Sequence, residues 1–161
     1  ISDTLLLKSP TTTEKDKKAL EALAKIADVD VNIYGLEMLK AGTDLSTFTI
    51  PEILKLDAKQ IDLKDKKSII NQVNTASIDD VMQMKEELED EIQKIIKDEE
   101  LDLFMLLITD IINSNSQVIV LGEHADIVEK AYDVKLEDNT ALLEGVVSRK
   151  KQVVPIMTKH A

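Results

Sequence analysis

The stretch Leu103–Ile108 limits the fold more than any other part of the sequence, because all six of its residues are apolar. A strand with one face in water alternates polar and apolar residues, whereas an unbroken apolar run of this length predicts a strand buried on both faces. A second apolar run, Val118–Leu121, follows after the turn-forming residues Asn113–Ser116. The two runs predict a hairpin at the centre of a sheet.

The rest of the chain supplies helices and strands around this hairpin. Apolar residues from Val81 to Ile95 recur at helical spacing and predict a helix from Ser77 to about Lys97. Further helices are predicted from Thr13 to about Asp28 and over Val31–Ala41, Ile50–Leu56, Ala125–Tyr132 and Val153–His160, and further strands over Ala58–Leu63, Ile69–Val73 and Ala141–Val147. Together these elements predict a single-domain α+β fold, with a mixed β-sheet of about five strands flanked by helices.

Local signals mark where the first two helices begin and end. Thr13 and Asp16 have the spacing in which a hydroxyl caps a backbone amide while the carboxylate reaches back, so a helix should begin there. Gly42 is the residue best suited to a left-handed cap after the second helix. Because Pro10 disfavours helix at the residue before it, Lys8–Thr13 is predicted to be a linker.

Composition excludes several classes of function. The chain has 161 residues, a formal net charge of -11 and only 2% aromatic residues. Nucleic-acid binding needs a broad basic surface with stacking or groove-reading side chains, so no nucleic-acid partner is expected. No apolar run is long enough to span a membrane and there is no cysteine, so we expect a cytoplasmic protein with no membrane partner, no disulfide and no thiolate metal site.

One short basic cluster stands out against this negative charge. Arg149, Lys150 and Lys151 are adjacent, and apolar residues flank them on both sides. Most short basic runs are solvated surface or decorate a helix end. In a chain this acidic, however, such a cluster is the obvious candidate for an anion site that acts through close contact.

The usual catalytic patterns are absent from the sequence. His124 and His160 are isolated, four glycines do not make a phosphate-binding loop, and no serine lies in a nucleophile-elbow pattern. Asp3 is a lone carboxylate, for which a helix cap is the plainest explanation. The residues alone therefore assign no catalytic group.

Five separated stretches nevertheless form a recognisable series. They are Ile1–Pro10, Tyr34–Gly42, Leu56–Lys59, Gln72–Asn74 and Gly145–Pro155. In this order they resemble the manganese-dependent family II inorganic pyrophosphatases of the DHH phosphoesterase superfamily. The resemblance covers essentially the whole chain, and Ser148–Gln152 resembles the substrate-binding signature of that family.

The resemblance implies that this chain is a C-terminal substrate-binding domain that closes over a metal-bearing DHH domain. It places residues 1–10 at the end of that preceding domain with its linker, and residues 11–161 in the substrate-binding domain. Because the chain begins without Met, with apolar Leu5–Leu7 close behind, we interpret it as a piece of a longer protein. The hinge is expected at Ser9–Pro10.

The resemblance also implies roles for individual residues. Arg149, Lys150 and Lys59 would bind pyrophosphate, and Asp3 would be one metal ligand. Lys151 belongs to the same motif, but no direct contact with substrate is expected for it. The catalytic ions would be manganese or cobalt, with magnesium as a companion of the substrate, and the missing domain would hold most of their ligands. No residue of this chain would be catalytic alone, so the isolated chain is expected to be inactive.

Two alternatives to a pyrophosphatase domain remain open from the sequence. The basic loop could belong to a non-catalytic regulatory module that binds an anion or a nucleotide. It could also serve a related DHH phosphohydrolase acting on short polyphosphate. By the same resemblance, the isolated chain is expected to be monomeric and the full-length protein homodimeric.

Overall fold

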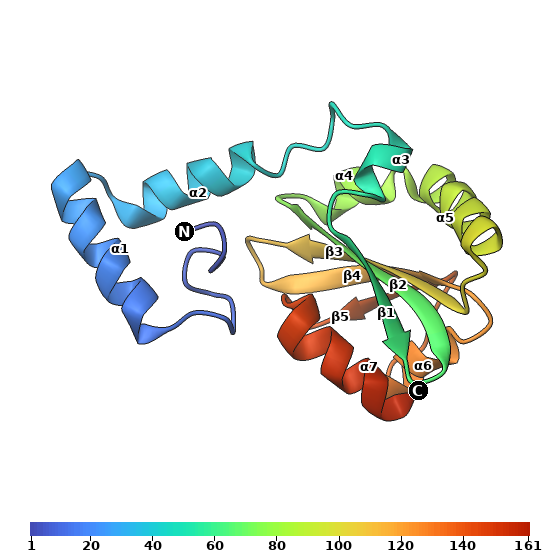
Figure 1. Ribbon diagram of the computed structural model, residues 1–161. Coiled ribbons are helices and arrows are strands. Elements are labelled where there is room, and N and C mark those ends of the chain that lie inside the picture. Colours follow the sequence, from blue (N-terminus) through green and yellow to red (C-terminus); the bar gives the residue numbers. More distant parts are fainter.

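The predicted central strands lie in the middle of a five-stranded sheet in the computed structural model, which describes residues 1–161 (Figure 1). The strands are β1 (Ala58–Leu63), β2 (Lys66–Thr75), β3 (Leu103–Asp110), β4 (Asn115–Leu121) and β5 (Thr140–Leu143), in that order across the sheet. β2 and β3 are parallel and the other pairs are antiparallel. The α+β class and the mixed five-stranded sheet are thereby confirmed.

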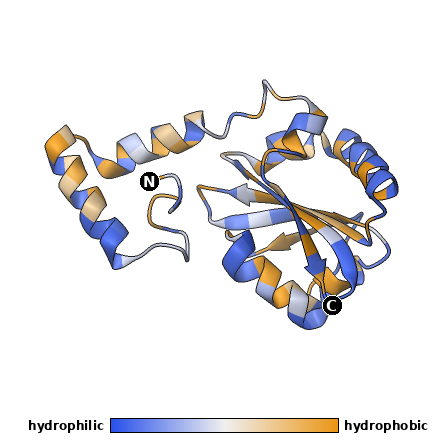
Figure 2. Ribbon diagram, viewed as in Figure 1, coloured by the Kyte–Doolittle hydropathy of each residue, from blue (hydrophilic) through white to orange (hydrophobic).

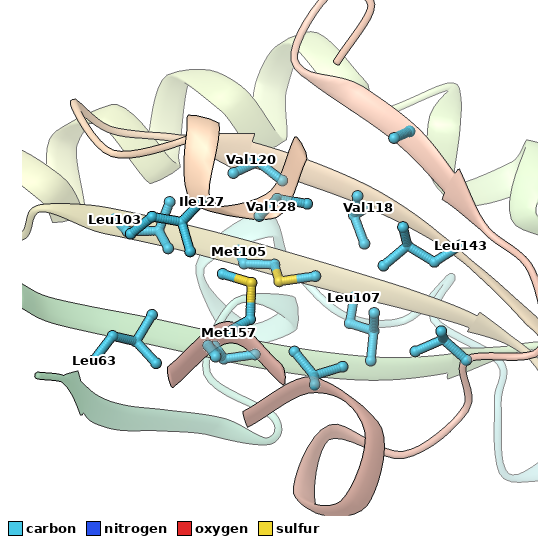
Figure 3. Close-up of a cluster of buried hydrophobic side chains, with 14 residues drawn as sticks. Leu63, Leu103, Met105, Leu107, Val118, Val120, Ile127, Val128, Leu143 and Met157 are labelled. Atoms are coloured by element: carbon cyan, nitrogen blue, oxygen red, sulfur yellow. The ribbon is translucent and has the colours of Figure 1, made fainter. Parts of the chain in front are cut away.

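Helices cover both faces of the sheet. On one face lie α3 (Ile50–Ile53), α4 (Ile78–Met82) and α5 (Lys85–Glu99), and on the other lie α6 (Asp126–Tyr132), a π-helical turn (Arg149–Val153) and α7 (Val154–His160). Figure 3 shows the second of these cores, in which Met157 of α7 faces Met105 of β3. All eight residues of β3 are buried, so the strand predicted to be buried on both faces is confirmed.

The structure corrects several predicted boundaries. The helix expected over 77–97 is interrupted at Gln83 and Met84, although no glycine or proline marks the break. The two resulting helices, α4 and α5, still contribute buried side chains to the same core, so the predicted apolar stripe is buried despite the break. Gly42 has a φ of -81° and is not a left-handed cap. The short helix expected to reach Leu56 ends at Ile53, and the last strand ends at Leu143 instead of Val147.

Two further helices lie to one side of the sheet, away from both of its faces (Figure 1). They are α1 (Glu14–Ala27) and α2 (Val31–Ala41), and the capping box of Thr13 and Asp16 at the start of α1 is confirmed. No residue of α1 is buried, and the side chains of Leu23 and Ile26 are 62% and 81% exposed. Figure 2 shows how much of α1 beyond its first turn is hydrophobic. Much of this apolar surface is therefore left uncovered by the rest of the chain.

The first residues form a series of turns and not part of a regular element. Leu5, Leu6 and Leu7 all have positive φ, a conformation that bulky residues seldom adopt. Leu5 is buried against α2 and the sheet, in a cluster with Leu39, Ile111 and Val147 and the partly buried Leu6 and Ala76. Apolar packing therefore holds the strained turn against the body of the protein.

No helix in the structure combines the length and the apolar character that crossing a membrane would need.

Gly122 follows β4 and allows a substitution test of the packing at the centre of the sheet. Its φ is +121°, and a Cβ there would lie 2.4 Å from the carbonyl oxygen of Asp102 and 2.9 Å from Cα of Leu103. Both are backbone atoms next to the buried strand β3, so neither can move cheaply. We expect Gly122→Ala to lower the free energy of unfolding by about 3 kcal/mol, measured by urea denaturation.

Gly145→Ala is the matched control for this substitution. Gly145 also has a positive φ, +70°, but a Cβ there would meet nothing within 4 Å. Only the backbone cost of about 1 kcal/mol should appear. Equal losses in the two variants would contradict the close approach at Gly122.

Candidate functional site

The basic motif forms the single-turn π-helix that leads into α7. The backbone N–H of Val154 donates to the carbonyl of Arg149, which closes the wide turn. Ser148 caps this turn, because its hydroxyl accepts from the backbone N–H of Lys151 at 3.3 Å. π-helical turns occur often at functional sites, because they re-aim side chains within a helix. The motif therefore has a defined backbone conformation that sequence patterns did not predict.

Gln152 holds the loop that enters the motif. Its Oε1 accepts from the backbone N–H groups of Val147 and Ser148 at 2.9 and 3.1 Å, and its Nε2 donates to the carbonyl of Gly145 at 2.8 Å. The phenol of Tyr132 donates to the carbonyl of Gln152 at 2.8 Å. Burial raises the pKa of Tyr132, so this phenol remains a hydrogen-bond donor throughout the physiological pH range.

Gln72 of β2 ties the motif to the sheet. Its Oε1 accepts from the backbone N–H of Arg149 at 3.1 Å, and its Nε2 donates to the carbonyl of Val147 at 3.0 Å and to the hydroxyl of Thr109 at 2.9 Å. Thr109 in turn lies 2.9 Å from the hydroxyl of Ser116, which donates to the carbonyl of Val146 at 2.6 Å. Three adjacent strands thus hold one loop through hydrogen bonds.

The guanidinium of Arg149 is held against the start of β1. Nη2 donates to Oδ1 of Asp57 at 3.0 Å, and Nη1 donates to the carbonyl of Ile70 at 3.3 Å and to that of Asp57. The Arg149 side chain is only 14% exposed, whereas that of Asp57 is 49% exposed. Arg149 therefore has a fixed orientation, and Asp57 faces both the arginine and solvent.

These residues border a cleft of about 350 Å³. Arg149 and Lys150 lie on one side, together with Asp57, and Asp3 lies on the N-terminal segment that forms another side. Two cations and two carboxylates therefore face the same space. The remaining lining residues are mostly polar: Ser2, Leu5, Ser9, Thr11, Gln72, Asn74, Val147 and Ser148. Such a lining suits a small, strongly polar ligand.

The structure brings three of the four predicted site residues to one cleft. Lys59 is not among the residues that line it. Lys59 pairs across the hairpin with Ile70, whose carbonyl accepts from Arg149, and it shares a face of β1 with Ile61. That face of the sheet packs on the core that also contacts the motif and α7. Lys59 therefore lies on the same side of the sheet as the motif.

Asp3 does not form a metal centre with other residues of this chain. Within residues 1–161, no group of three or more His, Cys, Asp or Glu side chains could hold a metal ion. A manganese or magnesium site needs several oxygen or nitrogen ligands, so the donor set present here does not fit a complete centre. Further ligands would have to come from outside this chain.

Two residues at the cleft had no predicted role. Asp57 and Gln72 both lie in stretches that carry the family resemblance, but sequence gives no sign that one contacts Arg149 and the other anchors the motif. The sequence separations are 92 and 77 residues. The only available signal was their position inside shared motifs.

Comparisons with known proteins identify the family of this chain. The sequence model of the DHHA2 domain family matches residues 36–160. A Bacillus subtilis protein named "Manganese-dependent inorganic pyrophosphatase" is 55% identical over 158 residues, which are 98% of this chain and 51% of that protein. A Bacillus velezensis protein, named a "Probable manganese-dependent inorganic pyrophosphatase", is 56% identical with the same coverage.

A solved structure is similar as well. The crystal structure of a Methanococcus jannaschii protein assigned to the family II inorganic pyrophosphatases has a TM-score of 0.89 and is 41% identical. The match covers 99% of this chain and 52% of that one. The chain therefore spans about half the length of the relatives that it matches.

Replacing Gln72 tests whether its side chain holds the motif. Gln72→Leu keeps the approximate volume but leaves the N–H of Arg149 and the carbonyl of Val147 without partners. We expect the free energy of unfolding to fall by about 2 kcal/mol, measured by urea denaturation. Gln60→Leu on exposed β1 is the control and should change it by less than about 0.5 kcal/mol. If the free energy of unfolding fell no more for Gln72→Leu than for Gln60→Leu, the hydrogen bonds of Gln72 to the motif would contribute nothing to stability.

Proposed function

Because the chain belongs to the DHHA2 domain family, we propose that it is the substrate-binding domain of a manganese-dependent inorganic pyrophosphatase. The complete protein would hydrolyse pyrophosphate to two phosphates. The observation that carries the proposal is the cleft that Arg149 and Lys150 of the motif line together with Asp3. The names of relatives that share more than half of their aligned residues with this chain support the same reaction.

Arg149 is suited to bind a phosphate in its present orientation. A guanidinium has five N–H donors, and the contacts with Asp57 and Ile70 use three of them. The two that remain, on Nε and Nη2, lie along one edge and can engage two oxygens of one phosphate group. Asp57 thus occupies the end of the arginine and leaves its side edge for an anion.

Lys150 and Lys59 would complete the phosphate contacts. Lys150 is exposed and lines the cleft, so its ammonium can meet a terminal phosphate oxygen without loss of an existing ion pair. Lys59 is also exposed, and it would reach the same anion from β1. Cations fixed around a phosphoryl group stabilise the charge that develops on its oxygens during hydrolysis.

Asp3 would contribute one carboxylate to the metal centre. The remaining ligands would lie in a DHH domain of the same polypeptide, and the relatives' names favour manganese as the metal. Cobalt would be a substitute, and magnesium would accompany the substrate. Because Asp3 is a lone ligand here, the 161-residue chain would not turn over pyrophosphate by itself.

The DHH domain would also cover the apolar surface of α1. A groove of about 430 Å³ runs between α1 and the N-terminal segment, and most of its lining residues are hydrophobic.

A division of the domains at residue 10 stays a prediction. The DHHA2 family model matches from residue 36, which lies within α2, so residues 11–35 lie outside the matched part. We place the complete protein in the cytoplasm as a homodimer, with this chain alone monomeric; the absence of cysteine suits a reducing compartment.

Arg149→Ala in the full-length protein tests the phosphate contact. A charge-assisted hydrogen bond contributes about 1.5 to 3 kcal/mol, so kcat/KM for pyrophosphate should fall by about 10- to 150-fold. Phosphate release measures this change. Lys135→Ala removes an exposed cation away from the cleft and should leave kcat/KM unchanged. A loss below about threefold for Arg149→Ala would place the arginine away from the phosphate.

Leu23→Glu tests whether another domain covers α1. The side chain of Leu23 is 62% exposed, so the substitution should not change the unfolding midpoint of the 161-residue chain. In the full-length protein it would bury a carboxylate, and the free energy of unfolding should fall by about 2 kcal/mol. Lys18→Glu, outside the groove, is the control. If Leu23→Glu changed the free energy of unfolding equally in the two proteins, another domain would not cover α1.

A further inference from the structure

Two lysines connect the N-terminal segment, residues 1–12, with the sheet and its motif. Nζ of Lys151, in the motif, donates to the carbonyl of Pro10 at 2.8 Å. Nζ of Lys8, in the segment, donates to the carbonyl of Ile112, after β3, at 3.0 Å. We call the contact between the segment and the rest of the chain the junction. One of its two hydrogen bonds has its donor in the segment, and the other has its donor in the motif. Each joins residues more than 100 positions apart in sequence, 141 and 104 respectively.

The apolar contact at this junction is small. Only four buried residues form its cluster, namely Leu5, Leu39, Ile111 and Val147, whereas the two sheet cores contain 14 and 13. Both lysines are exposed, so either ammonium can return to water when its bond breaks. The junction can therefore separate without leaving a buried charge, and the two lysine hydrogen bonds add to the apolar packing that resists separation.

The cleft depends on this junction. Ser2, Asp3, Ser9 and Thr11 come from the segment, and the motif residues come from the other side. If the segment moved away, Asp3 would no longer line one cleft with Arg149. Lys151 itself is not among the residues that line the cleft, although it belongs to the same motif as Arg149 and Lys150.

We propose that Lys151 and Lys8 are positioning residues, which hold the segment bearing Asp3 against the motif and so set the fraction of molecules with a formed cleft. This inference rests on the proposed function for its effect on catalysis, but the effect on the cleft is independent of it. The third cation of the motif then has a use distinct from phosphate binding. Its bond with Pro10 connects the substrate-binding loop directly to the linker.

Steady-state kinetics of the full-length protein provide the first test. Lys151→Met keeps the apolar stem and removes the donor, so fewer molecules have a formed cleft before substrate binds. Apparent affinity falls by that fraction, and the expected result is a three- to tenfold increase in KM for pyrophosphate, with kcat within twofold of wild type. Lys151→Arg still donates to a carbonyl and should restore KM. Lys159→Met, at an exposed position of α7, is the matched control.

A distance measurement provides a test that needs no activity. The chain has no cysteine, so Lys18→Cys on α1 and Glu144→Cys beside the motif can carry one spin label each. Wild type should give one main distance by pulsed electron paramagnetic resonance in the 161-residue chain. Lys151→Met and Lys8→Met should each add a population at a longer distance, and Lys159→Met should not.

The two tests separate the possible failures. Unchanged distances in both lysine variants would overturn the inference, whether or not the protein hydrolyses pyrophosphate. A loss of kcat at unchanged KM in Lys151→Met would also overturn it, because that result assigns Lys151 to the phosphate. An absence of hydrolysis in the wild-type full-length protein would instead refute the proposed function and leave the distance test decisive. Should Lys151→Met fail to fold, Lys8→Met supplies both readouts.

Discussion

The side-chain amide of Gln72 is the contact on which the geometry of the cleft depends. Its three hydrogen bonds join β2, β3 and the loop before the motif, so the position of the cation-bearing turn follows from the position of the sheet. A side chain on a regular strand is a rigid support, and β2 is paired with the buried strand β3 at this position. The side-chain amide of Gln152 acts in a similar way, because it alone forms hydrogen bonds with three backbone groups of the loop before the motif.

Burial of the central strands explains why these polar residues are needed. β3 and β4 are covered on both faces, yet Thr109 and Ser116 lie within them at full burial. A buried hydroxyl without a partner costs free energy, so each must find an acceptor inside the protein. Ser116 donates to the carbonyl of Val146, and Thr109 bonds to the hydroxyl of Ser116 and accepts from the side-chain amide of Gln72. The polar end of an otherwise apolar sheet therefore supports the loop beside the cleft, and Arg149 is fixed between Gln72 and Asp57.

Most elements of the fold could be predicted from the sequence because their signals are local. The apolar run of β3, the stripe of α5 and the capping box of Thr13 each lie within a few residues, and each appears in the structure. The break at Gln83 and the π-helical turn at Arg149 had no such signal. Their conformations follow from which side chains reach the core and from hydrogen bonds to distant strands, and neither is recorded in local spacing.

The sequence by itself determined the α+β class, the doubly covered central hairpin and the identity of the cations near the C-terminus, since periodicity and charge are properties of neighbouring residues. Only the tertiary structure decided that Asp3, Arg149 and Lys150 line one cleft while Lys59 does not, and that Asp57 and Gln72 hold the arginine. Those contacts join residues 77 or more positions apart. They form because packing two helical layers on the sheet brings its polar end, the motif and the first turn together, a result that no single stretch of sequence contains.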